Sequence, residues 1–138
     1  MKTYDAKDVV VTFGKVYITG FAEDMVTCGK DEEMFSTSVG AQGDVVVNTT
    51  NNPLGTISIT LQATSPQIAY LRNCAKNGTY AACYVTNKNL GERVGGSQAR
   101  IKNYPEGEYG AEVGDRTFEI QVFDYDEENI SDKSDANK

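Results

Sequence analysis

The chain of 138 residues contains no histidine and no tryptophan. Without histidine it lacks the most common general base, a His-activated nucleophile and a His-ligated zinc ion. Paired carboxylates can hydrolyse glycosides, but such enzymes usually also present aromatic platforms, and tryptophan is absent. These absences exclude most catalytic classes, and we expect neither an enzyme nor a cofactor.

Cysteine is scarce, with three residues at Cys28, Cys74 and Cys83. The number is odd, no pair has CxxC spacing, and three thiols cannot form a four-thiolate zinc site. The N-terminal sequence MKTYDAKDVV has no apolar segment of signal-peptide length, and no run approaches about 18 apolar residues. We therefore expect small apolar cysteines in a reducing cytosol, and no membrane-spanning segment.

Basic residues are fewer than acidic ones, 13 against 20, which makes the net charge −7. A protein that grips nucleic acid needs clustered Lys and Arg, so the acidic balance argues against specific binding of DNA or RNA. Repulsion between copies keeps such a chain soluble, and any self-assembly must overcome it.

Short β-rich runs separated by turn residues dominate the sequence. The clearest is TISITLQ, where apolar residues occupy every second position, so one face meets a core and the other is hydroxylated. One helix is predicted over 66–77, with Ser65 as its cap, Pro66 at its first position and Gly78 at a left-handed end. Strands are predicted at residues 9–13, 16–19, 35–39, 44–47, 56–62, 80–86, 98–102 and 116–125.

The segments between these runs are polar. Residues 20–34 have no clean period and many charges, which indicates a long loop or an extended β-arm. Residues 87–96 are predicted to form a polar, Gly-rich loop. Residues 1–126 are expected to form a single β domain, and 127–138 a disordered polar tail. The fold class is mainly β, a β-sandwich or split barrel with one flanking α-helix.

Two groups of carboxylates are the remaining candidates for chemistry. They could bind calcium or act in acid–base catalysis, although neither has the Asp-x-Asp-x-Asp-Gly loop of a calcium hand. The favoured interpretation is that both groups belong to solvated acidic loops. The residues are Asp31, Glu32 and Glu33 in one group, and Asp124, Asp126, Glu127 and Glu128 in the other.

Several strands are apolar on both faces. In the last predicted strand, Phe118, Ile120 and Val122 point one way, whereas Phe123 and Tyr125 point the other. A small antiparallel sheet usually leaves one face polar. Either a second chain covers part of this surface, or the sandwich interior and the helix absorb it. Unpaired sheet edges also need cover, and closing the sheets of several subunits into a ring provides it.

The chain resembles the small tail tube proteins of contractile-tailed phages and of related phage-tail-like particles, including tailocins. The resemblance rests on YDAKDVVVTFGKVYITGFAEDM, FSTSVGAQGDVVVNTTNNPLGTISITLQATSPQ and YGAEVGDRTFEIQVFDY, which cover most of the chain. The segments MVTCGKDEEM and NCAKNGTYAACYV fit the resemblance less well.

The resemblance implies a structural role in a virion tail assembled in the bacterial host cytoplasm. Hexameric rings would stack into a tube inside a sheath, alongside baseplate and tape-measure proteins, and each subunit would lend strands to one inner barrel. The segment 20–34 would pack on a neighbouring subunit or ring. The candidate residues for this contact are Glu23, Asp24, Met25, Lys30, Asp31, Glu32 and Glu33.

Six copies at −7 give a formal charge of −42 per ring, so an acidic wall would let DNA slide without sticking. Small hydroxylated strand faces suit such a wetted channel. The candidate lumen-facing residues are Ser36, Ser38, Asp44, Thr56, Ser58 and Thr60.

Two other functions remain open. One is a secreted tube protein of a type VI-like system, which uses the same ring but carries effectors. The other is a small acidic binding module or glycan-active domain, which would be a monomer with a deep, aromatic-lined pocket.

Overall fold

The computed structural model describes residues 5–105, 107 and 109–129. The secondary structure of this part is mainly β with one α-helix, as predicted. An eight-stranded antiparallel sheet has the order β2-β1-β7-β8-β9-β6-β3, with β10 also paired to β8, and β4 and β5 form a separate hairpin. The elements are η1 (Ala6–Asp8), β1 (Val9–Phe13), β2 (Val16–Ile18), β3 (Phe21–Lys30), β4 (Phe35–Val39), β5 (Val45–Thr49), β6 (Gly55–Leu61), α1 (Ile68–Asn77), β7 (Ala81–Asn87), β8 (Glu92–Asn103), β9 (Arg116–Val122) and β10 (Asp126–Asn129).

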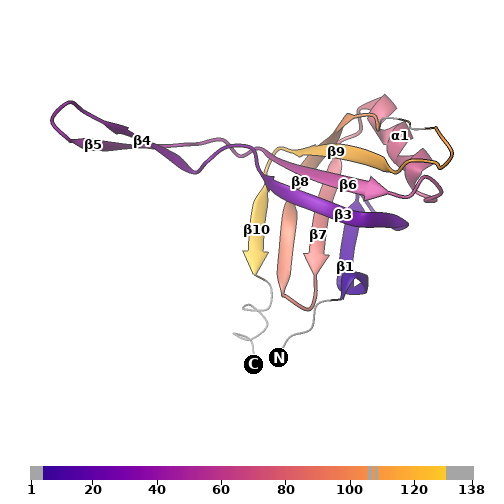
Figure 1. Cartoon of the computed structure of the whole chain (residues 1–138). Helices are drawn as coiled ribbons and strands as arrows, with labels where there is room; N and C mark the ends of the chain where they lie inside the picture. The colour runs from indigo at the N-terminus through magenta and orange to yellow at the C-terminus, as the bar shows by residue number, and fades with distance from the viewer. Residues whose placement is uncertain (1–4, 106, 108, 130–138) are drawn as a thin grey trace, which may run out of the picture.

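The sheet curls into a nearly closed barrel (Figure 1), in which β3, β6 and β9 run across β1, β7, β8 and β10. Strand β8 belongs to both groups, because its first half pairs with β10 and its second half with β9. Gly95 lies between the halves with φ +140°, and a Cβ there would collide with the Cys83 carbonyl. Glycine inside a strand is typical of a bend or a close backbone approach.

The barrel interior is the hydrophobic core. In β6 the buried residues Ile57, Ile59 and Leu61 alternate with half-exposed hydroxylated ones, as the sequence predicts. Helix α1 closes the core from one side with Ile68 and Leu71.

The helix differs from the prediction at its start. It begins at Ile68 rather than Pro66, and no side chain caps its N-terminus. The Ser65 hydroxyl instead donates a hydrogen bond to the Thr19 carbonyl at 2.6 Å. The helix does end as predicted, at Gly78 with φ 65°.

Of the two alternatives predicted for 20–34, a long loop is wrong for most of the segment and an extended β-structure is found, since β3 extends from Phe21 to Lys30 and pairs with β6. The register shifts between Phe21 and Val26, which indicates a bulge. A bulge inserts an extra residue and breaks the two-residue period, so no alternation is visible in the sequence.

Two other boundaries were also wrong. The predicted loop 87–96 is a short turn, because β8 already begins at Glu92. The predicted last strand ends at Val122, and residues 127–129 of the predicted tail belong to β10, which pairs with β8. The rest of that tail, residues 130–138, lies outside the described residues.

Candidate self-assembly surfaces

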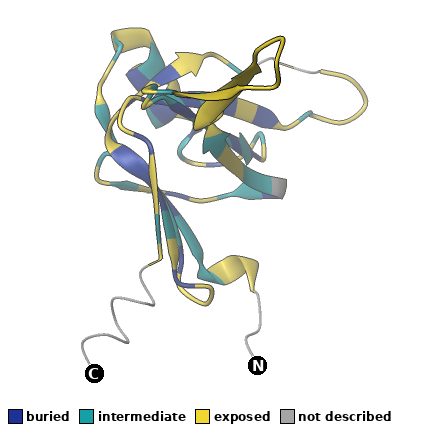
Figure 2. Ribbon diagram, turned by 90° about the vertical axis from the view of Figure 1, so that its left-hand side faces the viewer, coloured by how far each residue is buried: buried dark blue, intermediate teal, exposed yellow. Residues whose placement is uncertain are grey.

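The most exposed segment of the chain is the stretch 31–49, here called the arm. Its outer part is the β4–β5 hairpin, which projects away from the barrel (Figure 1). Every residue of the arm is exposed, as the yellow hairpin in Figure 2 illustrates. The arm therefore adds nothing to the core, although it contains a regular, fully paired hairpin.

The hairpin has an apolar and a polar face. Paired residues share a face, and the pairing of Val39 with Val45 and of Thr37 with Val47 places three valines on the same side as Phe35. These four apolar side chains are 55–66% exposed. No described residue of the barrel covers them, so this face lacks the apolar partner that such strands normally have.

The root of the arm is tied to the barrel by Asp31. One oxygen of its carboxylate accepts a hydrogen bond from the Thr56 hydroxyl at 2.6 Å, and the other accepts one from the Gln121 amide at 3.0 Å. These hydrogen bonds hold the pKa of Asp31 below its ordinary value. Asp31 thus links β6 and β9 to the point where the arm leaves the sheet.

Tyr125 holds the other side of the root. It is buried, its backbone amide donates to the Pro53 carbonyl at 3.0 Å, and its hydroxyl donates to Glu127 at 2.9 Å. Burial is the main reason that the pKa of Tyr125 is raised. The ring packs so closely over Gly55 that a Cβ there would collide with it. The sequence does not predict the contact between Gly55 and Tyr125, because no local pattern links two residues so far apart in the chain.

The predicted inter-subunit residues fall into two groups, one in the first half of β3 near its bulge and one at the root of the arm. Glu23 and Met25 are on β3, and Lys30 ends that strand. Glu32 and Glu33 are exposed in the connection to the hairpin. Asp24 also lies within β3, but its side chain is outside the described part of the structure.

The predicted lumen-facing residues fall on two separate surfaces. Thr56, Ser58 and Thr60 point outward from β6, and Thr60 shares a hydroxyl–hydroxyl hydrogen bond of 3.2 Å with Thr117 of β9. The other three, Ser36, Ser38 and Asp44, belong to the arm, and the two serines lie on the polar face of the hairpin.

The outer face of β3, β6, β9 and β8 is polar throughout. The register places Thr27, Ser58 and Glu119 in one row, and Thr56 and Gln121 in the next beside Arg100 of β8. These rows form a hydroxyl-rich surface. At its border, β3 ends the sheet order, so one edge of this ten-residue strand has no partner among the described strands.

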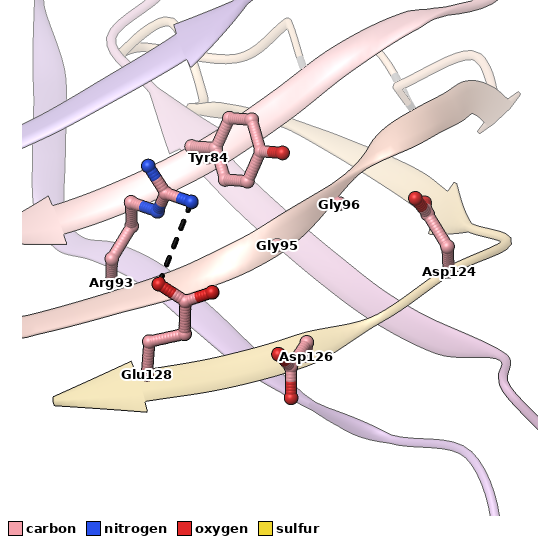
Figure 3. A pocket seen from close by; sticks show the side chains of 7 residues that line it. All are labelled: Tyr84, Arg93, Gly95, Gly96, Asp124, Asp126 and Glu128. Carbon is pink, nitrogen blue, oxygen red and sulfur yellow. Dashed lines mark ion pairs between the residues drawn. The ribbon is translucent and has the colours of Figure 1, made fainter.

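The second group of carboxylates lines a pocket beside β10 (Figure 3). Asp126 and Glu128 project from β10, and Arg93 forms an ion pair of 3.5 Å with Glu128 while its guanidinium lies 4.6 Å from the centre of the Tyr84 ring. Asp124 accepts hydrogen bonds from Ser97 and from the Gln98 amide.

These contacts lower the pKa of Asp124, the Ser97 hydroxyl being the largest cause. They also fix the turn before β10 against β8, which is a structural role for this carboxylate. Across the described part of the chain, no three His, Cys, Asp or Glu residues are grouped so as to hold a metal ion.

All three cysteines are free thiols. Cys74 and Cys83 are buried and Cys28 is exposed, and burial raises the pKa of Cys83 to about 12. Cys74 and Cys83 therefore behave as the small apolar residues that the sequence predicts for all three, whereas Cys28 departs from this prediction because it is exposed. Among the described residues, no helix combines the length and the apolar character needed to cross a bilayer.

Neither a family model nor a curated protein matches the sequence. Solved structures match its shape. A chain from the extended-state sheath/tube terminator of PVC, an extracellular contractile injection system, has a TM-score of 0.64 at 7% identity, over 93% of this chain and 98% of that chain. A chain from the cap of the anti-feeding prophage, its tube-terminating cap, has a TM-score of 0.61 at 9% identity, over 94% and 93%.

A third similar chain comes from the PVC sheath–tube complex in the extended state, with a TM-score of 0.64, 8% identity and 93% coverage of both chains. The fold is therefore one that occurs in the tube and cap regions of contractile injection particles. At 7–9% identity, the likeness establishes this fold and nothing finer.

Proposed function

We propose that the protein is a structural subunit that assembles with copies of itself into the inner tube of a contractile phage tail or a related particle. The observation that carries this proposal is the arm, in which 19 consecutive residues are exposed and one hairpin face is apolar. A monomer gains no stability from ordering such a segment in water. A neighbouring subunit that covers the hairpin supplies the missing burial.

The free edge of β3 supports the same proposal. An open ten-residue edge can pair with another strand, and natural proteins usually cover or blunt such edges. Pairing it with the sheet of the next copy would continue the barrel surface from subunit to subunit. Rings of six that stack into a tube are the form in which we expect this pairing to close, with sheath, baseplate and tape-measure proteins as further partners.

We further propose that the hydroxylated outer face of β6 and β9 lines the channel. The two acidic residues described beside this face, Asp31 and Glu119, are offset by Arg100 and Lys102 of the adjoining strand β8. The wall would then be polar and close to neutral rather than strongly acidic. DNA or ions would pass it without specific binding, because clustered cations are missing.

A second candidate is a subunit that ends a tube instead of extending it. Two of the similar chains come from structures described as a tube terminator and a tube-terminating cap. A terminator would form a single ring and would not stack by itself. A secreted tube protein of a type VI-like system would form the same rings as a tube subunit, and its cargo would distinguish it.

Sedimentation velocity and negative-stain electron microscopy of the purified full chain, over a wide range of concentration, test the proposal. We expect monomers when dilute and rings or tubes when concentrated. Single rings that never stack would favour the terminator. A monomer at every concentration would overturn the self-assembly role and favour a small binding module.

A further inference from the structure

We infer that the acidic arm of one copy docks on a basic, aromatic shelf of a second copy. The shelf comprises Arg100 and Lys102 of β8 together with Tyr80 and Phe123, beside the end of α1. This inference rests on the proposed self-assembly and names the two surfaces that meet.

The charges of the chain are separated along the sequence. The arm contains four acidic residues and no Lys or Arg, which gives it a charge of −4. The stretch 62–105 contains six basic residues and a single acidic residue, Glu92, so its charge is 6 − 1 = +5. A chain with net charge −7 thus carries a strongly positive segment, and its arm is an acidic, cation-free stretch that also projects from the barrel.

The shelf surrounds a shallow hollow of about 390 Å³, which Arg100, Lys102 and Phe123 line. The guanidinium of Arg100 lies 5.5 Å from the centre of the Tyr80 ring, and that ring lies 5.8 Å from Phe123. Both rings are exposed. Arg100 therefore lies beside an exposed aromatic ring, and Lys102 lines the same hollow as Phe123.

The first residues of the arm have the chemistry that the shelf requires, acidic side chains followed by apolar ones. Glu32 and Glu33 are followed by Met34 and Phe35, which are 72% and 55% exposed. Carboxylates can pair with Arg100 and Lys102 while the two apolar side chains pack on Tyr80 and Phe123. Apolar and charged groups are thus complementary over one short segment, as in a specific interface.

Within the described part of the subunit none of these charges forms an ion pair, although Arg100 donates a hydrogen bond of 3.4 Å to the Tyr80 hydroxyl. Between described residues there is one ion pair, Arg93 with Glu128. Glu32 and Glu33 accept no hydrogen bond from the described part of the chain. Lys102 makes a minor contribution to lowering the pKa of Asp31, whose carboxylate is already occupied by two hydrogen bonds.

We place the contact between copies. The root of the arm lies near the shelf of its own copy, because Asp31 accepts a hydrogen bond from Gln121, which lines the same hollow. Beyond the root, the hairpin points away from the barrel (Figure 1) and is free to reach a second copy. A contact between two different surfaces of identical chains is heterologous, and such contacts produce closed rings or open filaments rather than isolated dimers.

Charge reversal tests the contact. We expect Glu33→Lys alone and Lys102→Glu alone each to raise the concentration needed for assembly by about tenfold or more, because like charges then face each other. An equimolar mixture of the two variants restores each opposite-charge pair across alternating copies. Assembly of the mixture should therefore return to within about threefold of the wild type.

Asp44→Lys is the matched control, since it makes the same change of charge at the far tip of the arm. We expect it to impair assembly less than Glu33→Lys does, and thermal melting should show all variants folded. If the wild type assembles and the mixture fails to recover, the shelf is not the docking site although self-assembly stands. If the wild type never assembles, the proposed function itself fails.

Discussion

At the scale of single residues, close packing fixes the root of the arm. Gly55 is covered by the Tyr125 ring, and Gly29, which lies in the neighbouring strand, has open space where its Cβ would be. Both residues lie in the paired region of β3 and β6, and neither has a positive φ. The two glycines therefore differ in the room that is available for a Cβ atom, whereas neither needs the left-handed backbone conformation that favours glycine.

We predict that Gly55→Ala lowers the free energy of unfolding by about 1–3 kcal/mol, because the added methyl group forces the buried Tyr125 ring to move. Gly29→Ala should change it by less than about 0.5 kcal/mol. Urea unfolding curves at low protein concentration measure both. Equal stability of the two variants would mean that Tyr125 does not clamp Gly55.

At the scale of elements, the β4–β5 hairpin has two faces with different expected roles. Its apolar face includes Val45 and Val47, whereas Val46 lies on the opposite, mostly polar face. All three valines are exposed in the subunit. These valines therefore stabilise the fold little by themselves, and only a partner chain can bury them.

We predict that the double variant Val45→Ser, Val47→Ser weakens self-association by at least about tenfold, because burial of a valine side chain is worth about 1.5–3 kcal/mol. The single variant Val46→Ser should have a much smaller effect. Melting temperatures of all variants should match the wild type, since no core contact is removed. Association that depends equally on both faces would contradict docking by the apolar face.

The elements also show where sequence patterns succeed. The alternation of β6 and the glycine that ends α1 are local signals, and both predictions are confirmed. For β3 the sequence left a loop and an extended β-arm open, because a bulge breaks the period of the strand. Strand β10 was not predicted, because its residues, DEEN, are all polar. Strands of this kind are selected by pairing with a distant partner, which a local pattern does not record.

At the scale of the whole molecule, docking of an arm on a different surface gives the assembly a direction, with two unlike ends. Each copy would offer one arm and one shelf, so growth requires both on every copy. The Met34 carbonyl accepts a hydrogen bond from the Thr50 amide at 2.9 Å. A two-residue Gly-Gly turn can therefore replace residues 35–49 without disturbing the barrel.

We predict that this hairpin-deleted protein stays folded, does not assemble alone, and shortens wild-type assemblies when it is added in small amounts. It would accept an arm and offer no hairpin to the next copy. Electron microscopy gives the length distribution, and sedimentation gives the fraction assembled. Wild-type assemblies of unchanged length, with all of the deleted protein left as free monomer, would contradict a directional assembly that depends on the arm.

The sequence by itself determined the class of fold, the strongest strands, the helix and the buried nature of two cysteines, because period, turn residues and apolar content act over a few neighbouring positions. It also gave reason to expect that copies of the chain meet. Only the tertiary structure decided that residues 31–49 leave the barrel as an exposed arm, that Asp31 and Tyr125 hold its root, and that Arg100 and Lys102 gather beside exposed aromatic rings. These features depend on contacts between residues far apart in the chain, and such contacts exist only after the sheet has closed.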